Sequence, residues 1–405
     1  MDLTDREEHR LFRAEVRAFI EEHKHLAPKE TAISYRLQPR PYTQDVLDWQ
    51  KLLVKQGYAH RTIPKDYGGI GAEPDILKSR IIADEFFAAG LPQGLSSQGI
   101  SMLVPTLLEH GTEEQKQSWV KRTIEGDVFW CQGYSEPGSG SDLASLQTKS
   151  VEDGDDFVIN GQKIWTSSAQ IAPMIFCLVR TEPEADKYRG ISYLIFSMDT
   201  PGIDIRPLQT MTGHPSFNEV FFTDVRVPKS QVVGGRGNGW KVANSTLKHE
   251  RGMLSNAGGS QDRLNKIRAM MEREVCDGIK PSQDPLIRDR FIRLQARVQS
   301  MRLHEMRLIS LAEKGNPPGL GDMICKLIGC QLNYELDQMA IDLQGEYGLY
   351  FDDDPSVTSA SHWQKQSIYD LGLIIGGGTA QIQKNIIAER GLGMPREPKV
   401  QGGQN

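Results

Sequence analysis

Apolar residues recur at helical spacing through the first third of the chain. Thr4 and Glu7 match the pattern of a helix-capping box. The apolar residues that follow on one face of the predicted helix are Leu11, Phe12, Val16, Phe19 and Ile20. Thr112 and Gln115 repeat the capping pattern and predict the start of a later helix. Residues 1–128 are therefore expected to form a helical domain.

The pattern changes to short β-type runs between residues 129 and 240. Residues 157–159 and 163–166 flank Asn160-Gly161, a pair that accepts the positive φ values of a type I′ turn, so a hairpin is predicted here. Further apolar runs, separated by Gly and Pro clusters, cover residues 174–180, 191–198 and 218–227. Short strands at this spacing indicate a sandwich or barrel.

Helical spacing returns from residue 241 to the end of the chain. Residues 288–313 and 323–343 carry apolar side chains at the intervals of long amphipathic helices, which pack against one another as a bundle. The expected fold class is α+β multidomain. It comprises an N-terminal helical domain over 1–128, a middle β-sandwich or barrel over 129–240 and a C-terminal four-helix bundle over 241–405.

Composition and charge narrow the class of protein. The chain has 405 residues, of which 38% are hydrophobic and 25% charged, as is typical of a globular protein. A net charge of −6 gives no reason to expect a nucleic acid as partner. No apolar run approaches the roughly 18 residues of a membrane span, and the acidic start of the chain lacks the features of a signal or transit peptide. We therefore expect a cytoplasmic protein.

The cysteines and histidines form no disulfide or metal-binding pattern. The 5 cysteines are odd in number, widely spread and without a Cys-x-x-Cys pair, which favours reduced, buried thiols. Cys325 and Cys330 fall on different faces of a predicted helix, and His23 and His25 lie in a charged, solvated stretch. No metal site is predicted.

Two segments carry residues suited to binding an anionic or a flat ligand. Residues 130–142 are rich in glycine and hydroxyl groups, so main-chain amides there can approach a diphosphate, although the same composition also suits a plain surface loop. Trp165 places an aromatic plane beside the hydroxyls of residues 166–168, which fits either core packing or contact with a flat cofactor. The glycines of residues 234–239 lack the spacing and βαβ context of a nucleotide loop and are interpreted as a connector.

Four segments, taken together and in this order, resemble the acyl-CoA dehydrogenase family. They are Ser135-Glu136-Pro137-Gly138-Ser139-Gly140-Ser141-Asp142, Asn160-Gly161-Gln162-Lys163-Ile164-Trp165, the run from Asn218 to Pro228 and the run from Gly378 to Gly393. The resemblance spans nearly the whole chain and is therefore far more specific than any single motif. It implies a helical N-terminal domain, a β middle domain and a C-terminal helical bundle, with FAD held between them.

The resemblance also implies which residues reach FAD. The matching positions, in chain order, are Gln132, Tyr134, Ser135, Ser141, Trp165, Ser167, Thr379 and Gln381. The first three are expected along the flavin and the fourth at the diphosphate. The tryptophan is expected beside the isoalloxazine, with the following serine hydroxyl near the reactive nitrogen. The last two match family residues that also reach the cofactor.

The catalytic base departs from the commonest family pattern. The family's chemistry needs a carboxylate that takes the α proton of an acyl-CoA, and hydrogen-bond donors for the thioester oxygen. Much of the family places a Glu directly before Gly-Thr near the C-terminus, where this chain has Gly377. A subset places Glu before Arg on a helix of the C-terminal domain, as in Glu250-Arg251. We interpret Glu250 as the base and Arg251 as a substrate-positioning residue. The main-chain N–H of Gly377 is interpreted as a donor to the thioester oxygen. The alternative for Glu250 is a surface charge on a polar helix face.

A second departure concerns assembly. Many family members carry Arg-x-x-Phe-Gly on the first long C-terminal helix, where it contacts FAD of the neighbouring subunit. The matching places in this chain hold Glu274, Asp277 and Gly278. Either another basic residue substitutes for the missing Arg, or the partner subunit is a different chain.

The resemblance thus implies FAD-dependent α,β-dehydrogenation of an acyl-CoA thioester to the trans-2-enoyl-CoA, with electrons passed to an electron-transfer flavoprotein. A homodimer or tetramer, or a heteromeric assembly, is expected, without nucleic acid or a membrane span. Two alternatives stay open: a flavin oxidase on the same fold, and a non-catalytic subunit of a heteromeric acyl-CoA dehydrogenase.

Overall fold

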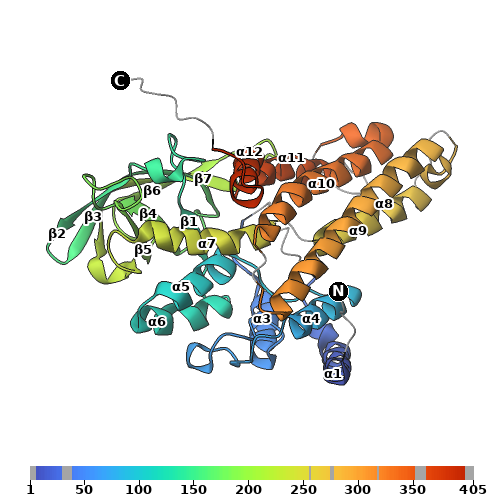
Figure 1. The fold of residues 1–405 in the computed structure, drawn as a ribbon, viewed down its shortest axis with the longest axis horizontal. Helices are drawn as coiled ribbons and strands as arrows, with labels where there is room; N and C mark the ends of the chain where they lie inside the picture. The colour runs from blue at the N-terminus through green and yellow to red at the C-terminus, as the bar shows by residue number, and fades with distance from the viewer. Residues whose placement is uncertain are drawn as a thin grey trace. The chain divides into compact units, whose positions relative to one another are not determined.

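A computed structural model describes residues 6–29, 39–254, 257–273, 278–316, 319–351 and 362–396. The chain divides into a first compact unit that ends at Met253 and a second that begins at Leu254 (Figure 1). Within this described part of the chain, no helix combines the length and the apolar character needed to cross a membrane.

Helices form the first part of the first unit, as their apolar spacing predicts. They are α1 (Glu7–His23), α3 (Gln44–Gln56), α4 (Ile76–Ala88), α5 (Val104–His110) and α6 (Glu113–Ile124). Val16, Phe19 and Ile20 of the predicted α1 face join the buried core, whereas Leu11 is exposed. Thr4 of the predicted N-terminal capping box lies outside the described residues.

The second predicted capping box is confirmed and connects α6 to the β structure. The Thr112 hydroxyl accepts from the main-chain N–H of Gln115 (3.2 Å), and the Gln115 side chain accepts from the Thr112 N–H (3.1 Å). The same Gln115 side chain donates to the main-chain oxygens of Ser230 (2.9 Å) and Val232 (3.0 Å). The cap therefore serves both helix initiation and packing between elements.

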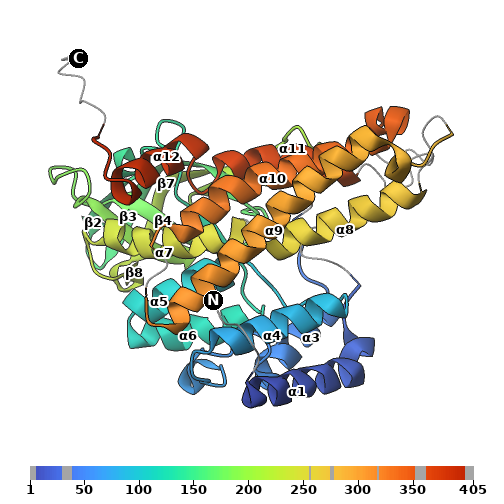
Figure 2. The ribbon, with the colours of Figure 1, turned by 45° about the vertical axis from the view of Figure 1, so that its right-hand side comes forward.

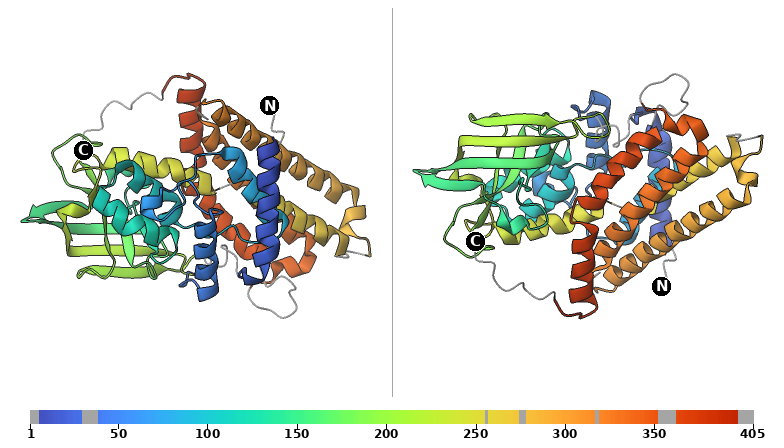
Figure 3. Two further views of the ribbon diagram at one scale, coloured as in Figure 1. Left: turned by 90° about the horizontal axis from the view of Figure 1, so that it is seen from below. Right: turned by 90° about the horizontal axis from the view of Figure 1, so that it is seen from above.

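Eight strands form one sheet in the first unit (Figure 3). They are β1 (Trp130–Gly133), β2 (Lys149–Asp153), β3 (Asp156–Ser167), β4 (Met174–Arg180), β5 (Ile191–Ser197), β6 (Ile203–Leu208), β7 (Phe217–Pro228) and β8 (Val232–Val233). The order is β6-β7-β3-β2-β4-β5-β8, and β1 pairs in parallel with β4. One apolar cluster joins Phe157 and Val227 to Cys177 and Leu194, so the two halves of the sheet pack on a shared core. The predicted middle β fold is confirmed.

The hairpin predicted at Asn160-Gly161 is wrong, because β3 runs straight through both residues. The turn between β2 and β3 instead uses Gly154 at φ 60°, next to the paired residues Asp153 and Asp156. Gly161 lies at a register shift, and a Cβ there would come within 2.6 Å of Thr148. Glycine at this position is therefore required by close packing rather than by a turn.

The second unit is a helical bundle, as predicted. Its helices are α8 (Ala257–Arg273), α9 (Pro285–Glu313), α10 (Gly321–Leu343), α11 (His362–Ile375) and the shorter α12 (Ala380–Ile386). Figure 2 shows α8, α9, α10 and α11 running side by side. Leu264, Leu294, Leu336 and Trp363 represent these four helices in one buried cluster.

A buried ionic cluster lies inside this bundle. The Arg263 guanidinium contacts Asp370 (2.5 Å) and Asp337 (3.4 Å), and all three side chains are largely or fully buried. Gln366 donates a further hydrogen bond to Asp370 (2.8 Å). Burial raises the pKa of Asp337 well above its usual range, the charge of Asp370 adds to this shift, and Arg263 opposes it. Burial together with the second carboxylate therefore favours the protonated form of Asp337 more than in an ordinary aspartate.

Candidate active site

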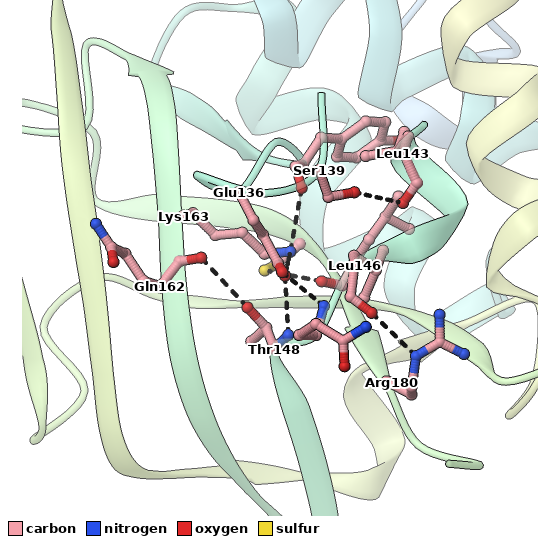
Figure 4. A network of polar contacts seen from close by, with 12 residues as sticks. Glu136, Ser139, Leu143, Leu146, Thr148, Gln162, Lys163 and Arg180 are labelled. Atoms are coloured by element: carbon pink, nitrogen blue, oxygen red, sulfur yellow. Dashed lines mark hydrogen bonds and ion pairs between the residues drawn. The ribbon is translucent and has the colours of Figure 1, made fainter. Parts of the chain in front are cut away.

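The glycine- and hydroxyl-rich loop after β1 is fastened to strand β3 by a buried lysine (Figure 4). Lys163 of β3 is fully buried, and its Nζ donates to the main-chain oxygen of Tyr134 (3.1 Å) and to Oε1 of Glu136 (2.8 Å). The main-chain N–H of Ile164 donates to the oxygen of Ser135 (2.9 Å). Two segments that the sequence singles out separately are thus held together as one structural element.

Glu136 organises the base of this loop. Its carboxylate accepts hydrogen bonds from the main-chain N–H groups of Gln147 (2.6 Å) and Thr148 (2.9 Å), besides Lys163. Burial acts to raise the pKa of Glu136, but the Lys163 charge and these hydrogen bonds hold it below the usual range. Glu136 and Ser139 also exchange two main-chain hydrogen bonds, both 3.0 Å long. This carboxylate is structural, a role that no local pattern in the sequence indicates.

The other predicted cofactor residues of this loop differ in exposure. Gln132, at the end of β1, accepts a hydrogen bond from the side chain of Gln98 (3.2 Å). Ser135 is half-buried, and Ser141 is exposed. The loop therefore presents hydroxyl groups at several depths above a rigid base.

Trp165 is held in a strained and exposed conformation. Its φ of 60° lies in the left-handed region, and the β3–β7 register shifts between Lys163 and Thr166. A non-glycine residue in this region costs on the order of 1–3 kcal/mol. The indole is 59% exposed and contacts Phe217 edge-on, with ring centroids 6.0 Å apart. Ser167, at the strand end, is half-buried. An exposed aromatic plane maintained against strain indicates a functional constraint rather than core packing.

Tyr134 and Glu250, far apart in the sequence, both belong to the first unit. The Tyr134 ring is buried and meets Phe176 and Tyr193 edge-on, at centroid distances of 6.0 and 6.2 Å. Glu250 is half-buried on α7 (Gly239–Leu254), one helical turn after the buried Thr246. Burial raises the pKa of Tyr134 well above its usual range, and the charges of Tyr193 and Glu250 add to this shift. The sequence indicates Tyr134 and Glu250 only through the family resemblance.

Two side-chain contacts fix α7 against α5. His110 and the Ser245 hydroxyl are 2.8 Å apart, and His249 and Glu109 are 3.2 Å apart. Ser245 and His249 both precede Glu250 on α7, so these contacts restrain the part of the helix that leads to Glu250. The side chain of Arg251, the predicted substrate-positioning residue, lies outside the described residues.

The predicted residues of the second unit gather at the loop before α12. Gly377 and Gly378 have φ values of 63° and 97°, and the buried Lys326 donates to the Gly378 oxygen (2.6 Å). The Thr379 hydroxyl caps α12 by accepting from the N–H of Ile382 (3.2 Å), while Gln381 is exposed. Left-handed geometry at position 377 favours glycine over the Glu found there in much of the family, by roughly 1–2 kcal/mol.

The three positions that replace the family's Arg-x-x-Phe-Gly motif are only partly described. Glu274 and Asp277 lie outside the described residues. Gly278 is exposed and has a φ of 79°.

Family models match nearly the entire chain. The N-terminal domain of acyl-CoA dehydrogenase matches residues 6–127, the middle domain residues 131–225 and the C-terminal domain residues 237–392. The family resemblance drawn from the sequence is therefore confirmed.

Individual proteins agree with these matches. The acyl-CoA dehydrogenase IpdE1 of Mycobacterium tuberculosis is 36% identical over 353 residues, covering 87% of this chain and 88% of the relative. The human mitochondrial short-chain specific acyl-CoA dehydrogenase is 29% identical over 336 residues, covering 80% and 78%.

Solved structures extend the likeness to the whole fold. The structure described as Tcur3481-Tcur3483 steroid ACAD is 31% identical, with a TM-score of 0.81 and coverage of 98% of this chain and 100% of that one. A chain of the ChsE4-ChsE5 complex of Mycobacterium tuberculosis is 29% identical, with a TM-score of 0.78 and the same coverage. This chain belongs to the acyl-CoA dehydrogenase family, whose members are flavin-dependent oxidoreductases acting on acyl-CoA.

Proposed function

We propose that this protein binds FAD and oxidises an acyl-CoA thioester to the trans-2-enoyl-CoA, with Glu250 as the base for the α proton. The observation that carries the proposal is the setting of Glu250. It lies on a helix restrained from α5, it is half-buried, and its Oε2 atom is withdrawn from solvent. Desolvation makes a carboxylate a stronger base, which abstraction of a weakly acidic α proton requires.

The first unit fits FAD in two ways. Trp165 offers an exposed indole plane in a strained conformation, suited to lie beside the isoalloxazine. The loop after β1 offers the hydroxyls of Ser135 and Ser141, together with Gly138 and Gly140, which border open space in which a diphosphate could approach main-chain amides. When bound, FAD supplies the acceptor for a hydride from the β carbon.

The remaining roles are assigned by the family pattern and by local chemistry. We assign the main-chain N–H of Gly377 to the thioester oxygen, because a main-chain donor stabilises enolate character without a side chain. Thr379 and Gln381 are assigned to the cofactor, as are Gln132, Tyr134 and Ser167. Arg251 is assigned to substrate positioning.

The electron acceptor and the partner subunit are part of the proposal. We infer that an electron-transfer flavoprotein reoxidises the enzyme, as the family pattern implies. We also infer that a different chain completes the assembly, because an acidic residue, Glu274, stands where a homomeric site would have its Arg. One similar structure is named as the ChsE4-ChsE5 complex, and another carries the two names Tcur3481-Tcur3483 and is described as a steroid ACAD. Acyl-CoAs with ring-bearing acyl groups therefore belong among the substrates to be tested.

The test is anaerobic bleaching of the bound flavin by a panel of acyl-CoAs. The panel contains short, long, branched and ring-bearing acyl groups, and the protein is purified alone and after co-expression with candidate partner subunits. We expect FAD to be released on denaturation, and at least one acyl-CoA to bleach the flavin. A protein that stays colourless with every partner would overturn the cofactor assignment. A flavin that no acyl-CoA reduces would favour the non-catalytic subunit.

A further inference from the structure

Three consecutive glycines, Gly376-Gly377-Gly378, form the turn between α11 and α12, called here the glycine turn. Gly377 and Gly378 have φ values of 63° and 97°, and the N–H of Gly376 donates to the oxygen of Gly372 (2.8 Å), which continues α11. Glycine loses more main-chain freedom on folding than any other residue, so three in a row are costly to order. Contacts from outside the turn are therefore needed to give it one conformation.

A buried lysine of α10 holds both ends of the glycine turn. The Nζ atom of Lys326 donates to the main-chain oxygen of Ile374 (3.0 Å), before the turn, and to that of Gly378 (2.6 Å), at its end. Lys326 is only 1% exposed, and burial of an ammonium is costly unless hydrogen bonds compensate it. Ile374 lies in the last turn of α11, where the partial negative charge of the helix end also favours a cation.

A buried glutamine of α12 holds the middle of the glycine turn. Gln383 is also 1% exposed, and its Nε2 atom donates to the main-chain oxygen of Gly377 (3.1 Å). A Cβ on Gly378 would come within 2.9 Å of the same Nε2, so glycine lets the glutamine side chain approach the turn this closely. The carbonyl oxygens of Gly377 and Gly378 are thus both fixed by side chains from other elements.

The main-chain N–H of Gly377 is left for another acceptor. Across the described residues of the chain, this N–H donates to no carbonyl oxygen and to no side chain. Gly377 is half-buried, so a ligand can reach its main chain. A turn with fixed carbonyls and an unused N–H is suited to stabilise negative charge that develops on an oxygen, because a preorganised donor needs no rearrangement during the reaction.

We propose that Lys326 is a positioning residue, which holds the glycine turn so that the main-chain N–H of Gly377 donates to the thioester oxygen of acyl-CoA. The inference rests on the proposed function, in which this N–H stabilises enolate character. Lys326 acts through the turn and does not itself touch the substrate. Its replacement leaves the turn fastened only by Gln383, so the glycines regain main-chain freedom and the donor is misplaced for part of the time.

The experiment compares Lys326→Met with the matched control Asn333→Leu in the flavin-loaded enzyme. Both residues are buried on α10 and lie two helical turns apart, but Asn333 is hydrogen-bonded to Ser260 of α8 (2.6 Å) and not to the glycine turn. Lys326→Gln keeps N–H donors at the same position and is the conservative variant. Flavin content and thermal unfolding verify that each variant is folded.

Three measurements separate positioning from general stability. Without ligand, amide hydrogen exchange of residues 376–379 should be faster in Lys326→Met than in the wild type. The carbonyl stretching band of a bound, non-oxidisable acyl-CoA analogue should move back toward its frequency in solution, because hydrogen bonding to the thioester oxygen lowers it. The limiting rate of anaerobic flavin reduction should fall about 10- to 100-fold, with a much smaller change in the Kd of acyl-CoA. Asn333→Leu should leave all three unchanged, and Lys326→Gln should be intermediate.

The outcomes that overturn the proposal are distinguishable from failure of the proposed function. If Lys326→Met keeps the wild-type exchange, carbonyl band and rate, or if Asn333→Leu changes them equally, the positioning role is wrong and the proposed function stands. If the wild type binds the analogue without lowering its carbonyl frequency, the Gly377 donor is wrong, and the positioning role falls with it. If no acyl-CoA reduces the flavin, the proposed function itself is wrong. Should Lys326→Met not fold, the same measurements on Lys326→Gln decide.

Discussion

The two units each bury an ionic cluster, but the first is balanced in charge and the second has more acidic than basic groups. In the first unit, one carboxylate, Glu136, faces one ammonium, Lys163, and accepts two main-chain hydrogen bonds. In the second, two carboxylates, Asp337 and Asp370, share one guanidinium, Arg263. The first arrangement lowers the pKa of its carboxylate, whereas burial in the second raises the pKa of Asp337.

The difference relates to what each cluster supports. The one-to-one pair lies directly beneath a loop with several predicted cofactor residues, and it ties that loop to the strand of Trp165 (Figure 4). The one-to-two cluster lies between three bundle helices, and its contacts involve none of the predicted site residues whose side chains the structure describes. A carboxylate paired with one ammonium gives a rigid base to a binding loop. A cluster with more carboxylates than cations makes the stability of the bundle sensitive to pH.

The largest expected effect is that of Lys163→Met. This change leaves the Glu136 carboxylate buried without its counter-ion, which typically costs about 3–5 kcal/mol in the free energy of unfolding. Urea unfolding followed by tryptophan fluorescence measures it, because 5 of the 6 tryptophans lie in the first unit. As a control, Lys163→Met combined with Glu136→Gln should lose less stability than Lys163→Met alone. Equal losses would show that the charge pairing does not matter.

A smaller effect of opposite sign is expected for Asp337→Asn. Because burial raises the pKa of Asp337, the folded bundle binds a proton that the unfolded chain releases above about pH 4. The stability of the second unit should therefore fall as pH rises from about 4 toward the raised pKa. Asp337→Asn should remove this slope and stabilise the bundle at pH 7 by roughly 1–3 kcal/mol. Hydrogen exchange of α8, α10 and α11 measures it.

Glu136 should show the reverse dependence on pH. Its pKa is lowered in the folded state, so its contribution is present above the ordinary carboxylate pKa and is lost as pH falls through the folded value. If hydrogen exchange showed both units losing protection in the same pH direction, the contrast between the clusters would be wrong.

The smallest effect concerns the strain at Trp165. Trp165→Gly should be about 1 kcal/mol more stable than Trp165→Ala, because glycine accepts the φ of 60° without a Cβ clash. Both variants should retain less FAD than the wild type after gel filtration. Retention of FAD at the wild-type level would instead assign the exposed indole to something other than the cofactor.

The sequence predicted the order of helical and β regions because burial imposes a period on each. The capping box at Thr112 was equally predictable, since its partners are three residues apart. The hairpin prediction at Asn160-Gly161 was wrong because a glycine required by close contact with Thr148 cannot be told from a turn glycine by its sequence neighbours. Local pattern cannot separate these two causes.

The site was predictable only where the family resemblance supplied it. The contacts of Lys163 with Glu136 and with the main-chain oxygen of Tyr134 join residues distant in sequence. No local period encodes such pairs, because they depend on how the sheet and the helices pack. The Gly377 position shows the same limit: the sequence indicates a lost carboxylate, and only the backbone φ shows why glycine is favoured there.

The most direct test of the account is the rate of anaerobic flavin reduction by the Glu250→Gln variant. Glutamine keeps the shape of the side chain but cannot take the α proton, and a general base typically supplies a rate factor of roughly 10²–10⁴. We expect the variant to retain FAD and bind acyl-CoA while reduction slows by at least that order. Glu113→Gln, at an exposed position of α6, is the control and should reduce flavin at the wild-type rate. A Glu250→Gln variant that reduces flavin at nearly the wild-type rate would contradict the catalytic assignment.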